Sequence, residues 1–176
     1  MNRVNYVVGI DPGFSGYITI MNCADLTIQC HPIPVISAGK KGTKKTIDGP
    51  AIREILNSID GNLIGVGIEK QQTMPKQGIA SSGKTMYGFG LFVGICIGLG
   101  VPMFLFRPAE WSKEMLKGVV GSDTKSRSII RAKELYPLHS LKRTPRCTTD
   151  SDGMADSILI AMYSLMNKVP LSVRGV

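Results

Sequence analysis

Four acidic residues occupy positions from which their side chains could converge on a metal ion. Asp11 and Glu69 each follow an apolar run with the composition of a buried strand. Asp152 and Asp156 are four residues apart where a helical pattern begins, so they share one face of that helix. Adjacent carboxylates repel one another without a cation, and hard oxygen ligands suit Mg²⁺. The four acids therefore predict a magnesium site, with the chemistry of a metal-dependent nuclease.

Each acid also has an ordinary structural explanation. Asp152 is a suitable helix N-cap, Asp11 precedes the turn-forming pair Pro12-Gly13, and Glu69 could be a surface residue. Any one of these explanations is adequate alone. Because three of the four acids lie at the ends of predicted elements, a shared site explains the set better.

The chain carries 21 Lys and Arg against 13 Asp and Glu, a net charge of +8. Basic side chains that neutralise phosphates gain affinity through counterion release, which favours a nucleic-acid partner. A basic surface also serves solubility alone, so charge leaves both interpretations open. The basic loop 39–45 is likewise either a solvated turn or an arm that contacts phosphates.

The four cysteines have no CxxC spacing, which predicts reduced thiols in a cytoplasmic setting and no zinc site; they are Cys23, Cys30, Cys96 and Cys147. The first five residues lead directly into a strand pattern and lack the features of a signal peptide. We expect no export and no membrane partner.

At 176 residues the chain is expected to form a single domain. Residue patterns predict strands at 5–10, 14–22, 25–36, 63–69 and 103–106, a flexible stretch at 71–82, and helices near 50–59, before residue 100, and at 108–117, 124–135 and 152–167. This order predicts an α/β domain with a mixed central sheet, in which strands 5–10 and 63–69 can lie side by side and bring Asp11 and Glu69 together.

Residues 86–106 contain no charge, a length that raises the question of a transmembrane helix. The break at Gly100-Val101-Pro102 instead predicts a helix followed by a buried strand. Gly90, Gly94 and Gly98 recur every fourth residue and make one smooth helix face. We expect this face to pack in the core, with a contact to a twin helix in a dimer as the alternative.

Residues 78–85 match the phosphate-binding pattern GxxxxGK[ST], which alone would indicate an ATPase. Such a loop should follow a buried strand directly, but residues 73–77 are polar and contain a proline. A later strand ending in an aspartate for Mg²⁺ is also missing. We interpret the match as coincidental, expect no nucleotide cofactor, and assign Lys76 and Lys84 to DNA phosphates.

The chain resembles the RuvC family of Holliday junction resolvases within the ribonuclease H-like superfamily, especially the RuvC-like proteins of bacteriophages and chloroplasts. Four segments carry the resemblance in the same order: Gly9-Ile10-Asp11-Pro12-Gly13, Ile68-Glu69-Lys70, Arg107-Pro108-Ala109-Glu110-Trp111 and Asp152-Gly153-Met154-Ala155-Asp156-Ser157. The segments Met74-Pro75-Lys76-Gln77-Gly78 and Tyr87-Gly88-Phe89-Gly90 are also similar to relatives. The similarity spans residue 6 to about residue 167.

The resemblance implies a ribonuclease H-like fold, a mixed five-stranded sheet with helices on both faces. It implies that Asp11, Glu69 and Asp156 are metal ligands, and that Asp152 is the fourth acid where some relatives carry histidine. Other relatives place this acid three residues before the last one, where this chain has Gly153. Lys125 is similar to a lysine on the DNA side of relatives. Trp111 matches a family tryptophan, and we expect it to anchor the helix 108–117 in the core.

The implied activity is two-metal hydrolysis of phosphodiester bonds at four-way DNA junctions by a homodimer, with Mg²⁺ as the ion and Mn²⁺ as an alternative. Asp11 is the expected bridging ligand, and Met74 a wedge in the junction.

Three alternative functions differ in testable ways. A related nuclease would use the same acids on flaps, other branched DNA or RNA–DNA hybrids. An ATPase would need Lys84, and a non-catalytic DNA-binding protein would need none of the acids.

Overall fold

The structure is a computed structural model that describes residues 3–38, 44–73 and 78–168. The elements are β1 (Asn5–Ile10), β2 (Tyr17–Asn22), β3 (Ile28–Pro32), β4 (Val35–Ala38), β5 (Lys44–Ile47), α1 (Gly49–Asn57), β6 (Asn62–Glu69), α2 (Ile79–Leu99), β7 (Met103–Phe106), α3 (Pro108–Met115), α4 (Thr124–Leu135) and α5 (Asp152–Lys168).

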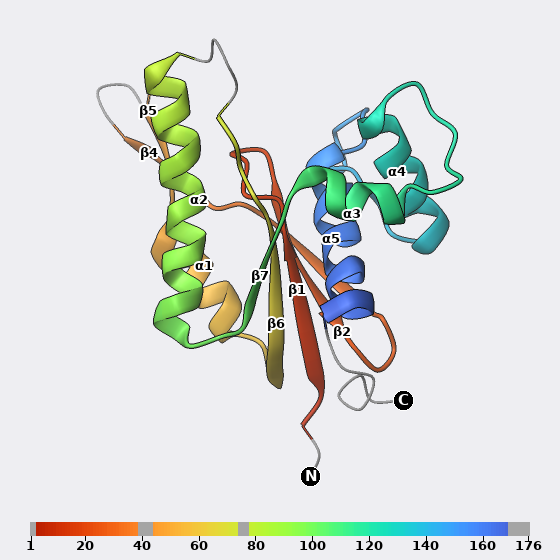
Figure 1. Ribbon diagram of the computed structural model, residues 1–176, viewed down its shortest axis with the longest axis horizontal. Helices are drawn as coiled ribbons and strands as arrows, with labels where there is room; N and C mark the ends of the chain where they lie inside the picture. Colours follow the sequence, from red (N-terminus) through yellow and green to blue (C-terminus); the bar gives the residue numbers. More distant parts are fainter. Residues whose placement is uncertain (1–2, 39–43, 74–77, 169–176) are drawn as a thin grey trace.

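A five-stranded sheet in the order β3-β2-β1-β6-β7 forms the centre of the protein (Figure 1). β1 pairs antiparallel with β2 and β2 with β3, as short connections require. β1 pairs in parallel with β6, and β6 with β7. The predicted mixed sheet is confirmed, including the adjacency of the two strands that precede Asp11 and Glu69.

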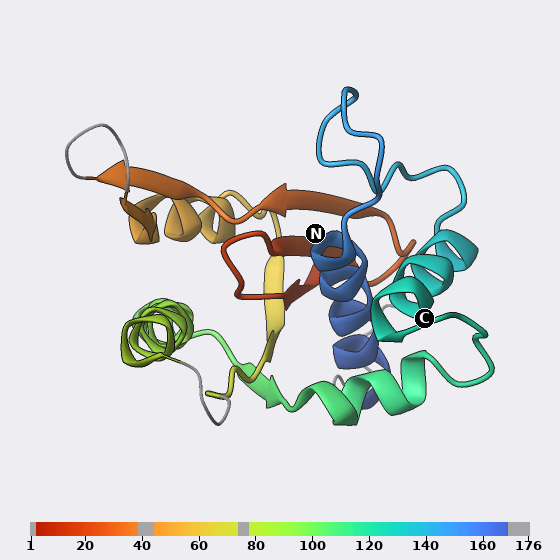
Figure 2. The same ribbon diagram turned by 90° about the horizontal axis from the view of Figure 1, so that it is seen from above.

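Helices cover both faces of the sheet, as predicted: α1 and α2 lie on one side, and α3, α4 and α5 on the other (Figure 2). The alternation of side chains along β1 divides the core in the same way. Val8 and Ile10 pack in the cluster that contains Ile52 of α1 and Phe92 of α2, whereas Val7 packs against α5. Side chains at odd-numbered positions of β1 therefore face α5.

Two glycines in the central strands allow α5 to approach the sheet closely. A Cβ atom at Gly9 would collide with the backbone of Ser157 and Ala161, and one at Gly67 would collide with the Ser164 hydroxyl. Thr19 of β2 and Ser157 join their hydroxyls across the same contact, 2.7 Å apart. The middle turns of α5, from Ser157 to Ser164, are therefore held directly against β1 and β6.

We expect Gly9→Ala to destabilise the protein by about 3 kcal/mol, because backbone atoms of α5 would have to move to admit one methyl group. Gly49→Ala is a matched control, since its Cβ would meet only the flexible side chain of Leu91. Its effect should stay below about 1 kcal/mol. Chemical denaturation measures both variants, and equal stabilities would contradict the close packing of α5 on β1.

The predicted strand 25–36 was wrong, because the segment divides into β3 and β4. Pro32 and Pro34 lack amide hydrogens and interrupt the ladder between them. β4 leaves the main sheet and pairs antiparallel with β5, forming a separate two-stranded sheet that the sequence patterns did not predict. Most of the basic loop 39–45 lies outside the described residues.

α2 differs from the prediction at both its start and its glycine face. It begins at Ile79, so the end of the stretch predicted to be flexible is helical, and it ends at Gly100, whose φ of 65° is left-handed. Cβ atoms at Gly90, Gly94 and Gly98 would meet nothing within 4 Å. The prediction that this face packs in the core was therefore wrong. Among the described helices, α2 alone is long and apolar enough to span a membrane, a test that many core helices also pass.

Candidate metal centre

The parallel pairing of β1 and β6 places two acids at the same edge of the sheet. Ile10 and Ile68 are partners in the ladder, and both side chains pack in the core beneath α1 and α2. The residues that follow them, Asp11 and Glu69, point to the opposite face because side chains alternate. This is the face on which α5 lies.

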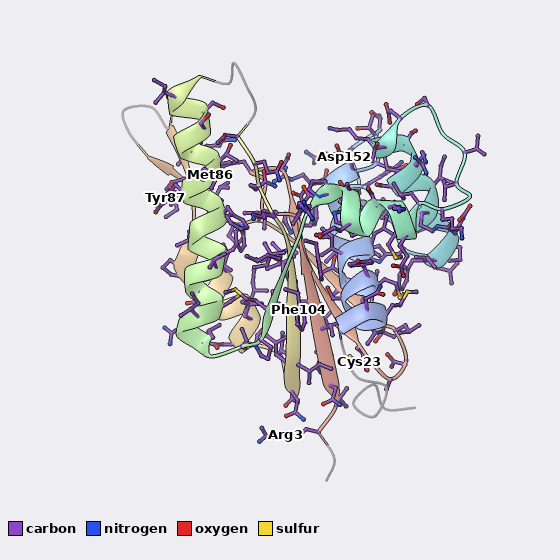
Figure 3. The ribbon with its side chains drawn as sticks, viewed as in Figure 1. Arg3, Cys23, Met86, Tyr87, Phe104 and Asp152 are labelled. Carbon is purple, nitrogen blue, oxygen red and sulfur yellow. The ribbon has the colours of Figure 1, made fainter. Side chains whose placement is uncertain are left out.

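The first turns of α5 supply the other two acids. Asp152 begins the helix and Asp156 follows one turn later, next to the buried residues Ala155 and Ser157. Figure 3 shows Asp152 at the end of α5 that overlies the carboxyl edge of the sheet. The helix and the two strands thus bring all four predicted acids to one region.

A tight turn fixes the direction of Asp11. The Gly13 amide donates to Asp11 Oδ1 over 3.2 Å, and the Asp11 amide donates to the Tyr17 carbonyl over 3.1 Å. A Cβ atom at Gly16 would collide with the Asp11 backbone, so this turn requires glycine there. The prediction of Asp11 as a turn former was correct, and the same turn orients its carboxylate toward α5.

Burial makes these carboxylates hard to ionise in the absence of a cation. It raises the pKa of Asp11 to about 6, and the charge of Asp152 adds to the effect. Burial likewise raises the pKa of Glu69 to about 7 and that of Asp156 to about 7, with further increases from neighbouring carboxylates. Raised pKa values of this kind are expected of buried carboxylates at one edge of the sheet.

The donor set suits a hard divalent cation. Asp156 Oδ1 is buried and has no well-formed hydrogen bond within the described part of the chain, although the buried Ser128 hydroxyl lies near enough to lower the pKa of Asp156. A bound cation would satisfy this oxygen and offset both the burial of the carboxylates, which is the main cause of the three raised pKa values, and their mutual repulsion. Within residues 3–38, 44–73 and 78–168, however, no three His, Cys, Asp or Glu side chains are close enough to share an ion. Binding one ion through three or more of the acids therefore requires their side chains to move. Asp152 is one of the side chains that would have to move.

Asp152 turns toward a lysine instead of toward the other acids. Lys125 Nζ lies 2.6 Å from Asp152 Oδ2, and this ion pair lowers the pKa of Asp152. The Lys125 side chain is 76% exposed, so its cation is accessible to a phosphate. At the next position, a Cβ on Gly153 would lie 2.8 Å from Asp11 Oδ2. Position 153 therefore faces Asp11 directly, and Asp152 reaches the site from its rim.

Trp111 holds the carboxylate of Glu69. Its indole nitrogen donates to Glu69 Oε2 over 2.9 Å. The expected core position of Trp111 is confirmed, since the residue is only 2% exposed. The hydrogen bond to Glu69 was not predicted, and the resemblance of Trp111 to a tryptophan of RuvC-like proteins was the one signal in the sequence that pointed to it.

The lysines predicted to contact DNA have different outcomes. Lys84 lies in the second turn of α2 and places its ammonium group 4.2 Å from the ring centre of Phe14, in the turn that follows Asp11. Lys76, like the predicted wedge Met74, lies outside the described residues. Lys84 therefore contacts the turn that follows Asp11, and Phe14 is a neighbour that sequence patterns missed.

The segment 78–85 does not form a phosphate-binding loop. Residues from Ile79 onward are already helical, and β6 ends at Glu69, well before the segment. From Ser82 onward the backbone amides donate to carbonyls of the preceding turn, beginning with the Gly78 carbonyl, so the segment cannot wrap around a phosphate as a loop. The interpretation of the motif as coincidental is confirmed by this geometry.

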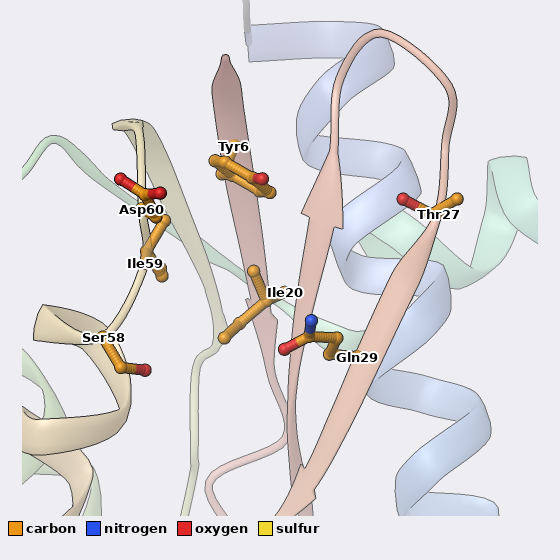
Figure 4. A pocket seen from close by; sticks show the side chains of 7 residues that line it. All are labelled: Tyr6, Ile20, Thr27, Gln29, Ser58, Ile59 and Asp60. Atoms are coloured by element: carbon orange, nitrogen blue, oxygen red, sulfur yellow. The ribbon is translucent and has the colours of Figure 1, made fainter. Parts of the chain in front are cut away.

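A small hollow of about 190 Å³ lies at the opposite end of the sheet from the acids (Figure 4). Its lining residues are Tyr6, Ile20, Thr27, Gln29, Ser58, Ile59 and Asp60. It holds a single carboxylate and none of the predicted site residues. This hollow is therefore not the candidate site, which is the acidic edge of the sheet.

No protein-family model matches the sequence, and no curated protein matches it significantly. Solved structures do match. Thermus thermophilus RuvC superposes with a TM-score of 0.50 at 20% identity, over 90% of this chain and 92% of that one. The same protein in complex with a Holliday junction substrate gives 0.53 at 17% identity, over 90% of each chain.

The yeast mitochondrial Holliday junction resolvase gives a TM-score of 0.53 at 12% identity, over 94% of this chain and 79% of that one. At these identities the similarity is one of fold. Both the order of strands and the position of helices on the two faces agree with the expectation from the sequence. The chain therefore has the ribonuclease H-like fold of the RuvC-type Holliday junction resolvases.

Proposed function

We propose that this protein is a metal-dependent endonuclease that hydrolyses DNA phosphodiester bonds at four-way junctions. The observation that carries the proposal is the gathering of Asp11, Glu69, Asp152 and Asp156 at one edge of a sheet whose fold is shared with junction resolvases. Fold similarity alone does not specify function, so the acids carry the chemical part of the argument.

In this proposal the four carboxylates hold Mg²⁺ or Mn²⁺. Bound ions would activate a water for in-line attack and stabilise the leaving 3′-oxygen. Asp11 would be the central ligand of the set, because it directly follows β1, the middle strand of the sheet, and its carboxylate faces the first turn of α5. Asp152 joins the ligand set when its carboxylate leaves Lys125.

Two basic side chains, one paired with Asp152 and one over the turn that follows Asp11, are suited to hold the DNA backbone. Lys125 is exposed at the rim next to Asp152, and Lys84 is exposed above Phe14. When the Asp152 carboxylate rotates away from Lys125 to bind a metal ion, the Lys125 ammonium group would pair with a DNA phosphate instead. One side-chain movement would then both complete the metal-ligand set and make Lys125 available to DNA. The net charge of +8 supports a polyanionic partner.

A two-fold dimer would place one site at each of the two symmetry-related cut points of a junction. The outer face of α2 is the surface we assign to this contact. Exposed residues recur there at alternating spacings of four and three, the seam spacing of paired helices, at Gly83, Tyr87, Gly90, Gly94 and Ile97. Figure 3 shows Tyr87 on the side of α2 that faces away from the sheet.

The seam combines exposed apolar side chains with room for close approach. Tyr87 is 59% exposed and Ile97 65% exposed. Cβ atoms at Gly90 and Gly94 would meet nothing within 4 Å, so a second helix can approach the backbone there. Burying this face against a second copy would remove apolar surface from water.

We expect Gly94→Glu to weaken dimerisation by at least about 100-fold, because it inserts a charged side chain into the centre of the seam. Ile130→Glu is the matched control, since Ile130 is 38% exposed on α4, a different helix. Analytical ultracentrifugation measures both. A monomeric wild-type protein, or a dimer unaffected by Gly94→Glu, would contradict the assignment. Binding of the monomer to uncharged lipid vesicles would assign the α2 face to a membrane instead.

Substrate preference tests the proposed function. Purified protein is incubated with a four-way junction, a flap, an RNA–DNA hybrid and plain duplex, with and without Mg²⁺. We expect Mg²⁺-dependent cleavage of the junction in preference to the others. Preference for the flap or hybrid would replace the substrate but keep the site, and binding without cleavage in either Mg²⁺ or Mn²⁺ would overturn the proposal.

A further inference from the structure

Trp111 is fixed in place by the core on the α5 side of the sheet. Its indole packs with Phe106 at the end of β7 and with Leu159 and Ile160 of α5. Only 2% of the residue is exposed, so the ring has no free volume in which to change rotamer. The direction of its single N–H group is therefore set by packing.

Hydrogen bonds from α4 hold the end of α3, the helix that carries Trp111. Arg127 donates to the carbonyls of Leu116 and Val119, over 2.6 and 3.0 Å, just beyond the end of α3. Arg131 donates to the Met115 carbonyl over 2.9 Å. Charged donors of this kind make strong hydrogen bonds. The end of α3 is thus tied to α4, whose first turn also carries Lys125.

The indole N–H has one hydrogen bond to donate, and a buried indole needs a partner. Here the partner is Glu69 Oε2, 2.9 Å away. A glutamate side chain has three rotatable bonds, and fixing one oxygen leaves little freedom for the other.

We propose that Trp111 is a positioning residue for the metal centre: its indole N–H orients the Glu69 carboxylate for a divalent ion. This role rests on the proposed function, since it requires Glu69 to be a metal ligand. In other metal sites, groups that hydrogen-bond to a metal-ligating side chain and orient it contribute about 10–100-fold to metal affinity. Trp111→Phe keeps an aromatic ring in the core but removes the N–H donor.

Direct metal binding is the test. Mn²⁺ affinity is measured by electron paramagnetic resonance of free Mn²⁺ for wild type, Trp111→Phe and Met115→Leu. Met115→Leu conserves volume in the same buried cluster and leaves the Trp111 N–H donor in place. We expect a 10–100-fold weaker affinity for Trp111→Phe, near-wild-type affinity for Met115→Leu, and recovery of cleavage by Trp111→Phe at high metal concentration.

A second measurement needs no variant at position 111. Trp111 is the only tryptophan in the chain, so its fluorescence reports on the indole that contacts Glu69. We expect Mg²⁺ to change the emission of the wild-type protein, and Glu69→Gln to abolish the change. This result would support the role even if Trp111→Phe failed to fold.

The outcomes separate the two proposals. Wild-type Mn²⁺ affinity in Trp111→Phe would overturn the positioning role and leave the proposed nuclease intact. An equal loss in Met115→Leu would show a packing effect and also overturn it. Failure of the wild-type protein to bind Mn²⁺ or Mg²⁺ at all would overturn the proposed function together with the role of Trp111.

Discussion

Asp11→Asn should reduce cleavage of a four-way junction by at least about 10³-fold while leaving junction binding unchanged or stronger. The substitution keeps the size of the side chain and its hydrogen bond from Gly13, but removes the charge that lies between the other acids. DNA binding survives because a phosphate meets less repulsion when one carboxylate is neutral. Cleavage is followed on denaturing gels and binding by fluorescence anisotropy without metal.

Asp123→Asn is the matched control for charge. Asp123 caps α4 by accepting from the Ser126 amide, and asparagine performs the same capping role. We expect wild-type cleavage from this variant. Full activity in Asp11→Asn would show that the carboxyl edge of the sheet is not the active site.

The second large effect concerns pH and metal together. At a fixed Mg²⁺ concentration we expect cleavage to fall at least about tenfold per pH unit below pH 6. Ligands must be deprotonated before an ion binds, and the pKa values of Asp11, Glu69 and Asp156 are raised to about 6, 7 and 7. Pre-steady-state cleavage of a labelled junction across this range provides the measurement.

The same pKa shifts determine how the stability of the metal-free protein changes with pH. The folded-state pKa values of Asp11, Glu69 and Asp156 lie above their unfolded values, so the metal-free fold holds more protons between about pH 4 and pH 7. Its stability therefore falls as pH rises through this range, and Mg²⁺ restores it where the acids are ionised.

At 100 times its dissociation constant, Mg²⁺ should raise the melting temperature by roughly 5–10 °C at pH 8, and by much less at pH 5.5. Differential scanning calorimetry at both pH values provides the check. The same increase at both pH values, or a full increase in Asp11→Asn, would contradict the account.

Much of the fold could be predicted because local patterns and chain order agree. The apolar runs before Asp11 and Glu69 predicted two central strands, and the four-residue spacing of Asp152 and Asp156 predicted a shared helix face. Parallel pairing of β1 and β6 then follows from the long connection between them. The location of the candidate site at the end of these strands was predictable for the same reason.

Features that depend on contacts between distant segments could not be predicted. The glycine face of α2 has the same sequence whether it packs inward or outward, and only the position of Phe92 and Cys96 in the core shows that it faces outward. The hydrogen bond from Trp111 to Glu69 and the ion pair of Lys125 with Asp152 join residues far apart in the chain. No local pattern encodes either pair.

The most direct test of the central claim is cleavage of a supercoiled plasmid that extrudes a cruciform, with Mg²⁺ present. A junction-resolving dimer makes two coordinated cuts, so the account predicts linear plasmid with both ends at the base of the cruciform, and no product from Asp11→Asn. Random nicks, open circles alone, or an intact plasmid would contradict it.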